Sequence, residues 1–138
     1  MAARWKEFDF SYQWDAQGTT VGYRPIIPVE LRSDSGSIRV NALIDSGCDC
    51  TMLEASLAEA LSIKQFSNSV SVGGVTGERR DAFTHDVSVT VDGFTPFMTD
   101  ATFVPSLPYA CLLGQRRFFD LFEVRFEKHR QKFFIRPA

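Results

Sequence analysis

Apolar and polar residues alternate along much of the chain, and a period of two is typical of half-buried β-strands. From residue 7 to residue 15, even positions up to 14 are aromatic and odd positions are polar or charged. A second alternation runs from Val87 to Val91 and ends at Asp92-Gly93, a strong turn signal. The strand pattern continues over 94–104, and 110–113 is a short apolar run that we expect to be buried. The pattern predicts a chain built mostly from strands.

One predicted hairpin joins residues 26–31 to residues 38–44 through the polar turn 33–37. Pro25 and Pro28 favour an edge or strand-end position for the first of these strands, because proline donates no ladder hydrogen bond. The second strand becomes fully apolar toward Ile44, so its far end is expected to be buried.

Two further hairpins follow. Val70–Val72 precedes a glycine-rich tip at 73–77, which predicts a hairpin loop. Residues 124–126 and 133–135 flank a basic turn and predict a final hairpin.

Helical patterns are short. Leucines at every fourth position, with glutamates on the other side, predict one or two helical turns from residue 53 to residue 61. A second short helix is predicted over 116–121, after Gly114. The spacing of short strands indicates a mainly β fold with a small closed architecture.

Composition limits the function classes. The chain has 138 residues, 44% hydrophobic and 23% charged, which suits one globular domain. A net charge of −2 gives no reason to expect nucleic acid or an anionic membrane as partner. No apolar run approaches the roughly 20 residues of a membrane span, and the start lacks a signal-peptide pattern. Three cysteines fit a reducing compartment, so we expect a cytoplasmic protein.

The sequence Leu43-Ile44-Asp45-Ser46-Gly47 places a carboxylate directly after a buried strand. Burial disfavours a charged carboxylate unless other groups compensate. Asp45 is therefore either functional or held by local hydrogen bonds in an Asx-turn that closes the strand.

The wider context favours function. Residues 42–53, Ala-Leu-Ile-Asp-Ser-Gly-Cys-Asp-Cys-Thr-Met-Leu, resemble the active-site stretch of the retropepsin-like (retroviral-type) aspartic proteases. Cys111-Leu-Leu-Gly114 before a helix resembles the second motif of that family, and the hairpin tip at 73–77 resembles its flap. The resemblance implies a closed, barrel-like β lobe with a flap hairpin and one or two short helices. It predicts a protease domain over 24–138 and a strand-forming extension over 1–23.

The resemblance also implies roles for single residues. Asp45 is the expected catalytic acid, the Ser46 hydroxyl is expected to hydrogen-bond across a dimer, and Gly47 lets a substrate backbone approach. The expected substrate-binding residues are Asp49, Cys48, Gly73, Gly74, Val75 and Leu112.

The sequence departs from the family pattern at three places. Gln115 follows Gly114 where the family has an arginine, which leaves open whether Arg116 reaches Asp49. Cys48 replaces the usual alanine, and the flap lacks a fully apolar tip, with the charged run 78–80 after it.

Hydrolysis of an amide without a metal or a nucleophilic side chain needs an activated water and a proton donor. Two adjacent carboxylates supply both because they share one proton, as is known for aspartic proteases as a class. This chain has one suitable loop, since Asp34-Ser35-Gly36 lies in a polar turn. A homodimer with two-fold symmetry brings Asp45 to its copy. We expect a peptide or protein substrate, no cofactor and no metal.

We expect the strands near the two termini to build the rest of the dimer interface. These strands are 124–126, 133–135 and the aromatic segment 8–14. The alternative is that these strands pack on their own domain.

Other functions remain open at this point. The chief alternative is a binding or assembly module that keeps the fold with weak or no peptidase activity. Cys48, Cys50 and Cys111 match no standard zinc spacing, and no residue besides a cysteine suggests a cysteine protease. The basic turn 128–132 is a minor indication of nucleic-acid binding.

Overall fold

The structure, a computed structural model, describes residues 3–14, 20–74 and 77–138, with residues 14, 20 and 21 described by their backbone only. The strands are β1 (Lys6–Asp9), β2 (Ser11–Trp14), β3 (Thr20–Arg24), β4 (Ile26–Arg32), β5 (Ser37–Ile44), β6 (Met52–Glu54), β7 (Asn68–Gly73), β8 (Arg79–Val91), β9 (Phe97–Val104), β10 (Cys111–Leu113), β11 (Phe122–Glu127) and β12 (Lys132–Pro137). The short helical segments are α1 (Leu57–Ala60), η1 (Gln115–Phe119) and η2 (Lys128–Arg130). Among the described residues, no helix is both long and apolar enough to cross a membrane.

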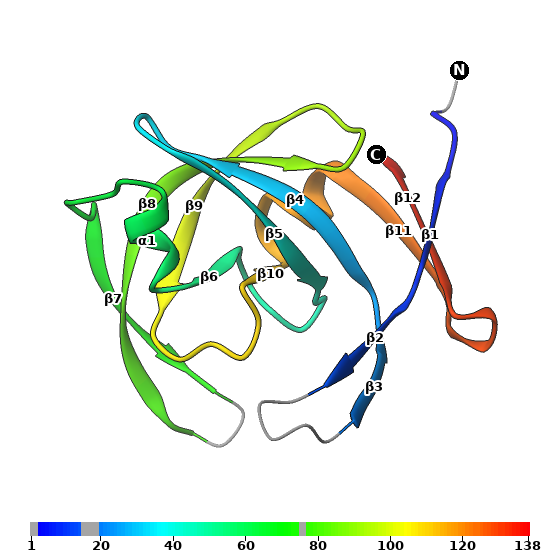
Figure 1. The fold of residues 1–138 in the computed structure, drawn as a ribbon, viewed down its shortest axis with the longest axis horizontal. Helices are drawn as coiled ribbons and strands as arrows, with labels where there is room; N and C mark the ends of the chain where they lie inside the picture. The colour runs from blue at the N-terminus through cyan, green and yellow to red at the C-terminus, as the bar shows by residue number, and fades with distance from the viewer. Residues whose placement is uncertain (1–2, 15–19, 75–76) are drawn as a thin grey trace.

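Seven strands form one sheet in the order β4-β5-β10-β6-β9-β8-β7. An additional pairing of β4 with β8 closes six of these strands into a ring and leaves β7 outside it (Figure 1). The ring confirms the prediction of a mainly β, closed architecture.

The core fills this ring because alternate residues of its strands point inward. Ile27, Val29 and Leu31 are almost fully buried on β4, and the alternation from Val87 to Val91 on β8 buries its valines in the same way. Each such side chain stabilises the fold by about 1.5–3 kcal/mol relative to an exposed one. All three residues of β10 are buried because β10 lies between β5 and β6, which confirms the predicted burial for 111–113, whereas Ala110 is half-buried.

The first predicted hairpin is confirmed, with β4 antiparallel to β5. The expected edge position of its first strand holds only in part. Pro28 pairs with Asn41 of β5 and lies just before the stretch 29–32 that also pairs with β8. The prediction is wrong for 29–32, because ring closure gives these residues a second neighbour.

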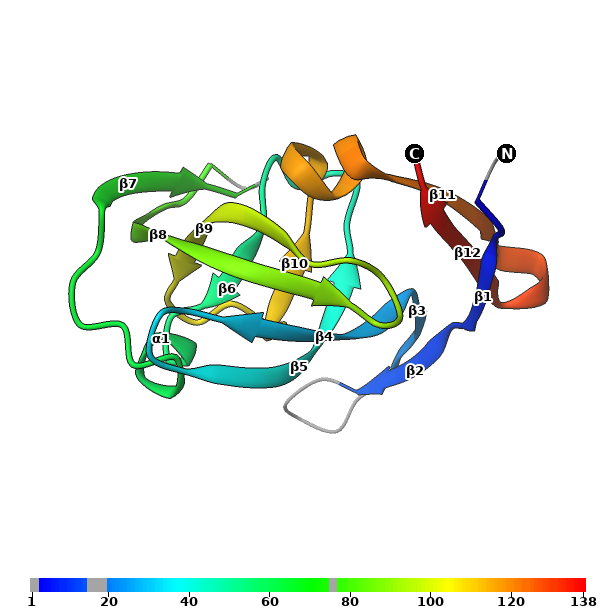
Figure 2. The ribbon, with the colours of Figure 1, turned by 90° about the horizontal axis from the view of Figure 1, so that it is seen from above.

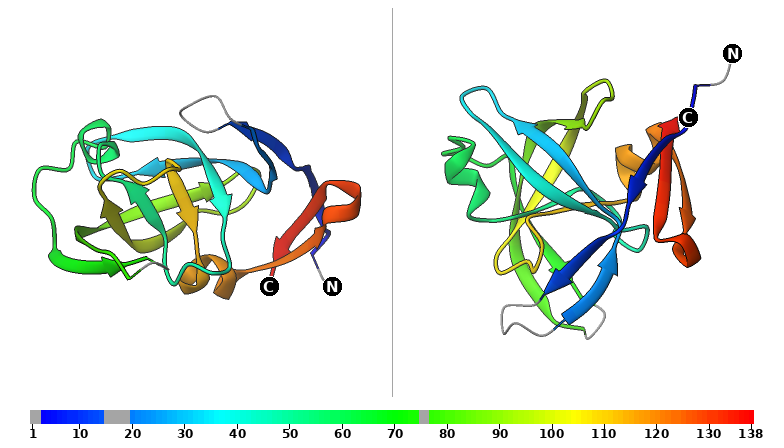
Figure 3. Two further views of the ribbon diagram at one scale, coloured as in Figure 1. Left: turned by 90° about the horizontal axis from the view of Figure 1, so that it is seen from below. Right: turned by 45° about the vertical axis from the view of Figure 1, so that its right-hand side comes forward.

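The two chain ends meet in a separate sheet of order β1-β12-β11, beside the ring (Figure 3). The predicted terminal hairpin is confirmed as β11 and β12. Phe8 of β1 stacks on Phe133 of β12, with 5.2 Å between the ring centroids. The long aromatic alternation is split at Phe10, because β1 pairs with β12 whereas β2 pairs with β3. The terminal strands therefore pack on their own chain in this structure.

Both predicted helices are shorter than expected. Residues 52–54 form β6, which pairs with β9 and β10, so α1 begins only at Leu57. Leu61 nevertheless lies in the core, as its spacing indicated. The second is an irregular helical turn, since Arg116 and Arg117 have non-helical backbone angles and Arg117 has a φ of 72°.

Candidate active site

The Asp45 loop, residues 45–51, begins after Ile44, at the buried end of β5. β10 runs parallel to β5, with Leu113 opposite Ile44. The two strands therefore end at the same edge of the sheet. There the Asp45 backbone N–H donates to the Leu113 carbonyl at 2.9 Å. This pairing brings the two distant sequence motifs together.

The Asp45 carboxylate is half-buried, and its Oδ1 accepts a hydrogen bond from the Gly47 backbone N–H at 3.0 Å. The Cys48 N–H donates to the Asp45 carbonyl at 3.1 Å. The loop therefore forms the Asx-turn that was the alternative to a functional role for Asp45. This turn fixes the orientation of the carboxylate. A Cβ at Gly47 would lie 3.3 Å from Oδ1, so a side chain there would crowd the acid.

Gly114 lets the loop approach the chain after β10. A Cβ at this position would lie 2.4 Å from the carbonyl oxygens of Cys48 and of Cys50, too close for any real side chain. The Gln115 backbone N–H donates to the Cys48 carbonyl at 2.8 Å. Glycine is required here by close backbone contact.

Two further hydrogen bonds attach η1 to the Asp45 loop. The Gln115 Nε2 donates to the Ser46 carbonyl at 2.6 Å, and the Arg116 backbone N–H donates to the Asp49 carbonyl at 2.9 Å. Among the described residues, no ion pair joins Asp49 to Arg116, so the contact between them is made by the backbone. Sequence reasoning noted Gln115 only as a departure from the family pattern and missed its contact with Ser46.

A cavity of about 600 Å³ lies between the Asp45 loop and the β7–β8 hairpin. Figure 2 shows the loop after β5, the turn after β10 and the end of this hairpin along one edge of the molecule. Of the predicted site residues, those that line the cavity are Asp45, Gly47, Cys48, Asp49, Gly73, Gly74 and Leu112. Ser46 is exposed beside them, and Val75 lies outside the described residues.

Sequence reasoning missed the rest of the lining, which comprises Met52, Val72, Glu78, Arg80, Val104 and Leu107. These residues come from four separate stretches of chain and carry no local motif. Only the closed sheet brings them to one cavity.

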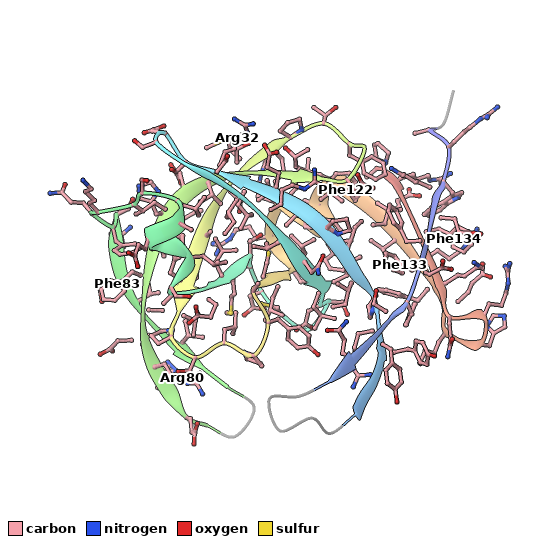
Figure 4. All side chains as sticks on the ribbon, viewed as in Figure 1. Arg32, Arg80, Phe83, Phe122, Phe133 and Phe134 are labelled. Atoms are coloured by element: carbon pink, nitrogen blue, oxygen red, sulfur yellow. The ribbon has the colours of Figure 1, made fainter. Side chains whose placement is uncertain are left out.

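Arg80 ties the β7–β8 hairpin to the rest of the site. Its guanidinium donates to the carbonyls of Pro105 at 2.9 Å and Ser106 at 3.3 Å. Figure 4 shows Arg80 near the end of the hairpin, on the side of the loop between β9 and β10. Arg80 and Leu107 both line the cavity, so this contact joins two of its walls.

A second hollow, of about 750 Å³, is lined in part by Ser33, Asp34, Ser35 and His85. Asp34 and Ser35 belong to the other Asp-Ser-Gly tripeptide, in the turn between β4 and β5. That turn is closed by the Ser33 hydroxyl, which accepts the N–H groups of Ser35 and Gly36. Asp34 is exposed and follows no buried strand end, so the smaller cavity is the better candidate.

Two buried thiols adjoin Asp45. The Cys48 thiol donates to the Cys50 carbonyl at 3.1 Å, and the Cys50 sulfur lies 3.6 Å from the Thr102 hydroxyl. Interaction with the Cys48 side chain lowers the pKa of the Cys50 thiol, and Thr102 and Arg116 lower it further. Interaction with the Cys50 side chain, together with burial, raises the pKa of the Cys48 thiol.

Burial alone raises the pKa of Cys111 to about 12. In the part of the chain that the structure describes, no group of three or more His, Cys, Asp or Glu residues is placed to hold a metal ion. Among these residues, Cys48, Cys50 and Cys111 do not form such a group.

Comparisons with known proteins agree with this geometry. No curated protein matches the sequence. A retropepsin-like aspartic protease from Rickettsia conorii has a similar structure, with a TM-score of 0.61 and 13% identity over 94% of this chain and 98% of that one. The EIAV protease complexed with the inhibitor HBY-793 has a TM-score of 0.55 and 23% identity over 70% of this chain and 86% of that one. At these identities the two structures establish the fold.

The profile of the aspartyl protease family matches residues 27–116, which include the Asp45 loop, the β7–β8 hairpin and Gly114. The chain therefore belongs to the aspartyl protease family and has the retropepsin-like fold.

Proposed function

We propose that the protein is an aspartic endopeptidase that hydrolyses peptide bonds as a homodimer, with Asp45 of each subunit in one shared site. The observation that carries the proposal is the half-buried Asp45 carboxylate at a strand end, on the wall of a cavity that the β7–β8 hairpin also lines. Family membership supports the same chemistry.

In this mechanism the two Asp45 carboxyl groups share one proton across the two-fold axis. The ionised carboxylate takes a proton from a water molecule, and that water attacks the peptide carbonyl carbon. The protonated carboxyl gives its proton to the carbonyl oxygen, which forms a neutral tetrahedral intermediate. The hydrogen bond from Gly47 to Oδ1 keeps each carboxylate oriented during these transfers.

The cavity suits an extended peptide with apolar side chains. Met52, Val104, Leu107 and Leu112 supply apolar walls, and the hairpin residues Gly73 and Gly74 have no side chain to keep a substrate backbone away. Asp49 and Cys48 line the same wall as Asp45 and complete the proposed substrate-binding set.

The proposed dimer interface uses surfaces that the fold leaves open. β12 pairs with β1 on one side and β11 on the other, so it cannot pair with a second subunit while this sheet is intact. Ser46 is exposed next to Asp45, in position for its hydroxyl to contact the other subunit. We therefore place the interface at the Asp45 loop and at the outer edges of β1 and β11.

A binding or assembly module is the second candidate. Two observations favour it, the charged run 78–80 after the hairpin tip and Gln115 in place of the family arginine. The retained Asp45, Ser46 and Gly47 favour the enzyme. All three cysteines are free thiols, which supports a reducing compartment such as the cytoplasm.

The test compares Asp45→Asn with Asp34→Asn on a mixed peptide library, because the chain offers the same tripeptide in an exposed turn as a matched control. We expect cleavage by the wild type and by Asp34→Asn, and none by Asp45→Asn. Equal cleavage by both variants would show that another group is the catalyst. Peptide binding without cleavage by any of the three proteins would favour the binding module.

A further inference from the structure

We propose that Cys48 and Cys50 form a redox-active dithiol that a peroxide oxidises to a disulfide within the Asp45 loop, reversibly inactivating the neighbouring site. The effect on activity rests on the proposed peptidase function, whereas the thiol chemistry does not.

The two thiols are placed together by the loop. Both side chains point into the protein and are 8% and 6% exposed, although Asp49 between them is exposed. The Cys48 thiol donates to the Cys50 carbonyl at 3.1 Å, so the two residues are in direct contact, and the Cys48 side chain lowers the pKa of the Cys50 thiol. A thiolate next to a thiol that can donate its proton is the arrangement that dithiol oxidation needs.

The surroundings favour charge on Cys50. Arg116 and the Thr102 hydroxyl both act on its sulfur and lower the pKa of this thiol. Cys48 lines the 600 Å³ cavity, which gives a small oxidant a route to the pair. A peroxide fits this route, whereas the low exposure of both sulfurs disfavours bulky disulfides.

The reaction balances in two steps. The Cys50 thiolate attacks one peroxide oxygen, the O–O bond breaks, and a sulfenic acid forms while the released hydroxide takes a proton and becomes water. The Cys48 sulfur then attacks the sulfenic sulfur, an S–S bond forms, and the displaced hydroxide leaves as water with the Cys48 proton. The two thiols lose two electrons in total, and hydrogen peroxide is reduced to two water molecules.

The disulfide would change the geometry of Asp45. In the reduced protein, the Cys48 N–H donates to the Asp45 carbonyl and the Cys48 carbonyl accepts from the Gln115 N–H. The Cys48 thiol donates a hydrogen bond to the Cys50 carbonyl. Closing an S–S bond between residues two apart removes the thiol hydrogen bond and imposes the fixed geometry of a disulfide on this part of the loop. Because the loop is packed against Gly114 without spare room, this strain passes to Asp45.

Cys111 provides an internal control. It is fully buried on β10, and burial raises the pKa of its thiol, so it is expected to stay reduced. Trypsin separates the two kinds of thiol, because cleavage after Arg39 and Lys64 leaves Cys48 and Cys50 on one peptide. Cleavage after Arg80 and Arg116 puts Cys111 on another.

The experiment treats the purified full chain with hydrogen peroxide, alkylates the remaining thiols and maps the tryptic peptides by mass. We expect peptide 40–64 to lose two hydrogen atoms and take no alkyl group, while peptide 81–116 is alkylated at Cys111. Full alkylation of peptide 40–64, added oxygen on Cys48 or Cys50 rather than on Met52, or a crosslink between chains would each overturn the proposal.

The same samples are assayed for peptide cleavage before and after a dithiol reductant. We expect peroxide to slow cleavage roughly tenfold or more, as misplacement of a catalytic group does, and the reductant to restore it. Cys111→Ala should respond like the wild type, and Cys50→Ala should keep the rate of its own untreated sample. A disulfide that forms in a cleaving enzyme without changing its rate would overturn the switch. Absence of cleavage in every sample would count against the proposed function, and the peptide masses would still decide the thiol site.

Discussion

The side-chain amide of Gln115 donates a hydrogen bond of 2.6 Å to the backbone carbonyl of Ser46, which joins the turn after β10 to the Asp45 loop. The family resemblance places an arginine at this position. Here a neutral amide from one motif holds the backbone of the other, and the adjacent backbone bonds from Gln115 and Arg116 reinforce it.

Replacing Gln115 should therefore loosen the loop. We expect Gln115→Ala to lower the free energy of unfolding by about 1 kcal/mol, the value of one hydrogen bond, and to lower kcat. Gln115→Glu should be worse, because a carboxylate oxygen would face the Ser46 carbonyl. Urea unfolding and steady-state kinetics measure both effects. Gln65→Ala, at an exposed site far from the loop, is the control, and equal losses in it would contradict a specific role.

Gly114 and Gly74 allow a matched comparison of alanine substitutions at a packed and at an open glycine. A Cβ at Gly114 would lie 2.4 Å from two carbonyl oxygens, whereas a Cβ at Gly74 would meet nothing within 4 Å. We expect Gly114→Ala to destabilise the fold by about 1–3 kcal/mol or more, as overpacking does. Gly74→Ala should leave the unfolding midpoint nearly unchanged. Wild-type stability of Gly114→Ala would show that the loop is not packed as described.

Arg80 should affect substrate binding more than stability. Its guanidinium bridges the β7–β8 hairpin and the carbonyls of Pro105 and Ser106, and all of these groups are exposed. We expect Arg80→Ala to raise KM several-fold while the free energy of unfolding changes by about 0.5 kcal/mol or less. Arg79→Ala is the control for charge. An unchanged KM in Arg80→Ala would exclude the bridge as a determinant of binding.

The Cys50 thiol should make stability depend on pH. Its pKa is lowered from 9.0 to about 6, chiefly by the Cys48 hydrogen bond. A lowered pKa in the folded state adds stability that is fully present above the unfolded value and is lost as pH falls toward 6. The free energy of unfolding of the wild type, relative to Cys50→Ala, should therefore rise between pH 6 and pH 9. A pH-independent difference would contradict the thiolate.

The strand-end position of Asp45 could be predicted from the sequence, whereas much of the cavity wall could not. Asp45 could be found because a carboxylate directly after a buried strand conflicts with local preference and needs a special reason. The cavity wall from Met52 to Leu107 could not, because its members meet only after β6, β8 and β9 have paired.

The errors have similar causes. The leucine spacing from Leu53 indicated a helix, but pairing with Cys111 and Phe103 holds the first turn as a strand. The aromatic alternation is split at Phe10, because its two halves have different partner strands. In each case tertiary pairing outweighs a local pattern that fits two structures.

Pairing of two Asp45 carboxylates is the central claim, and subunit mixing tests it most directly. Wild-type chains are refolded from urea together with increasing amounts of Asp45→Asn chains, and cleavage is measured per wild-type chain. Because each active site needs two Asp45 residues, activity per wild-type chain should fall in proportion to the wild-type fraction, while mixing with Asp34→Asn chains should leave it unchanged. Activity per wild-type chain that stays constant at every excess of Asp45→Asn would contradict a shared site.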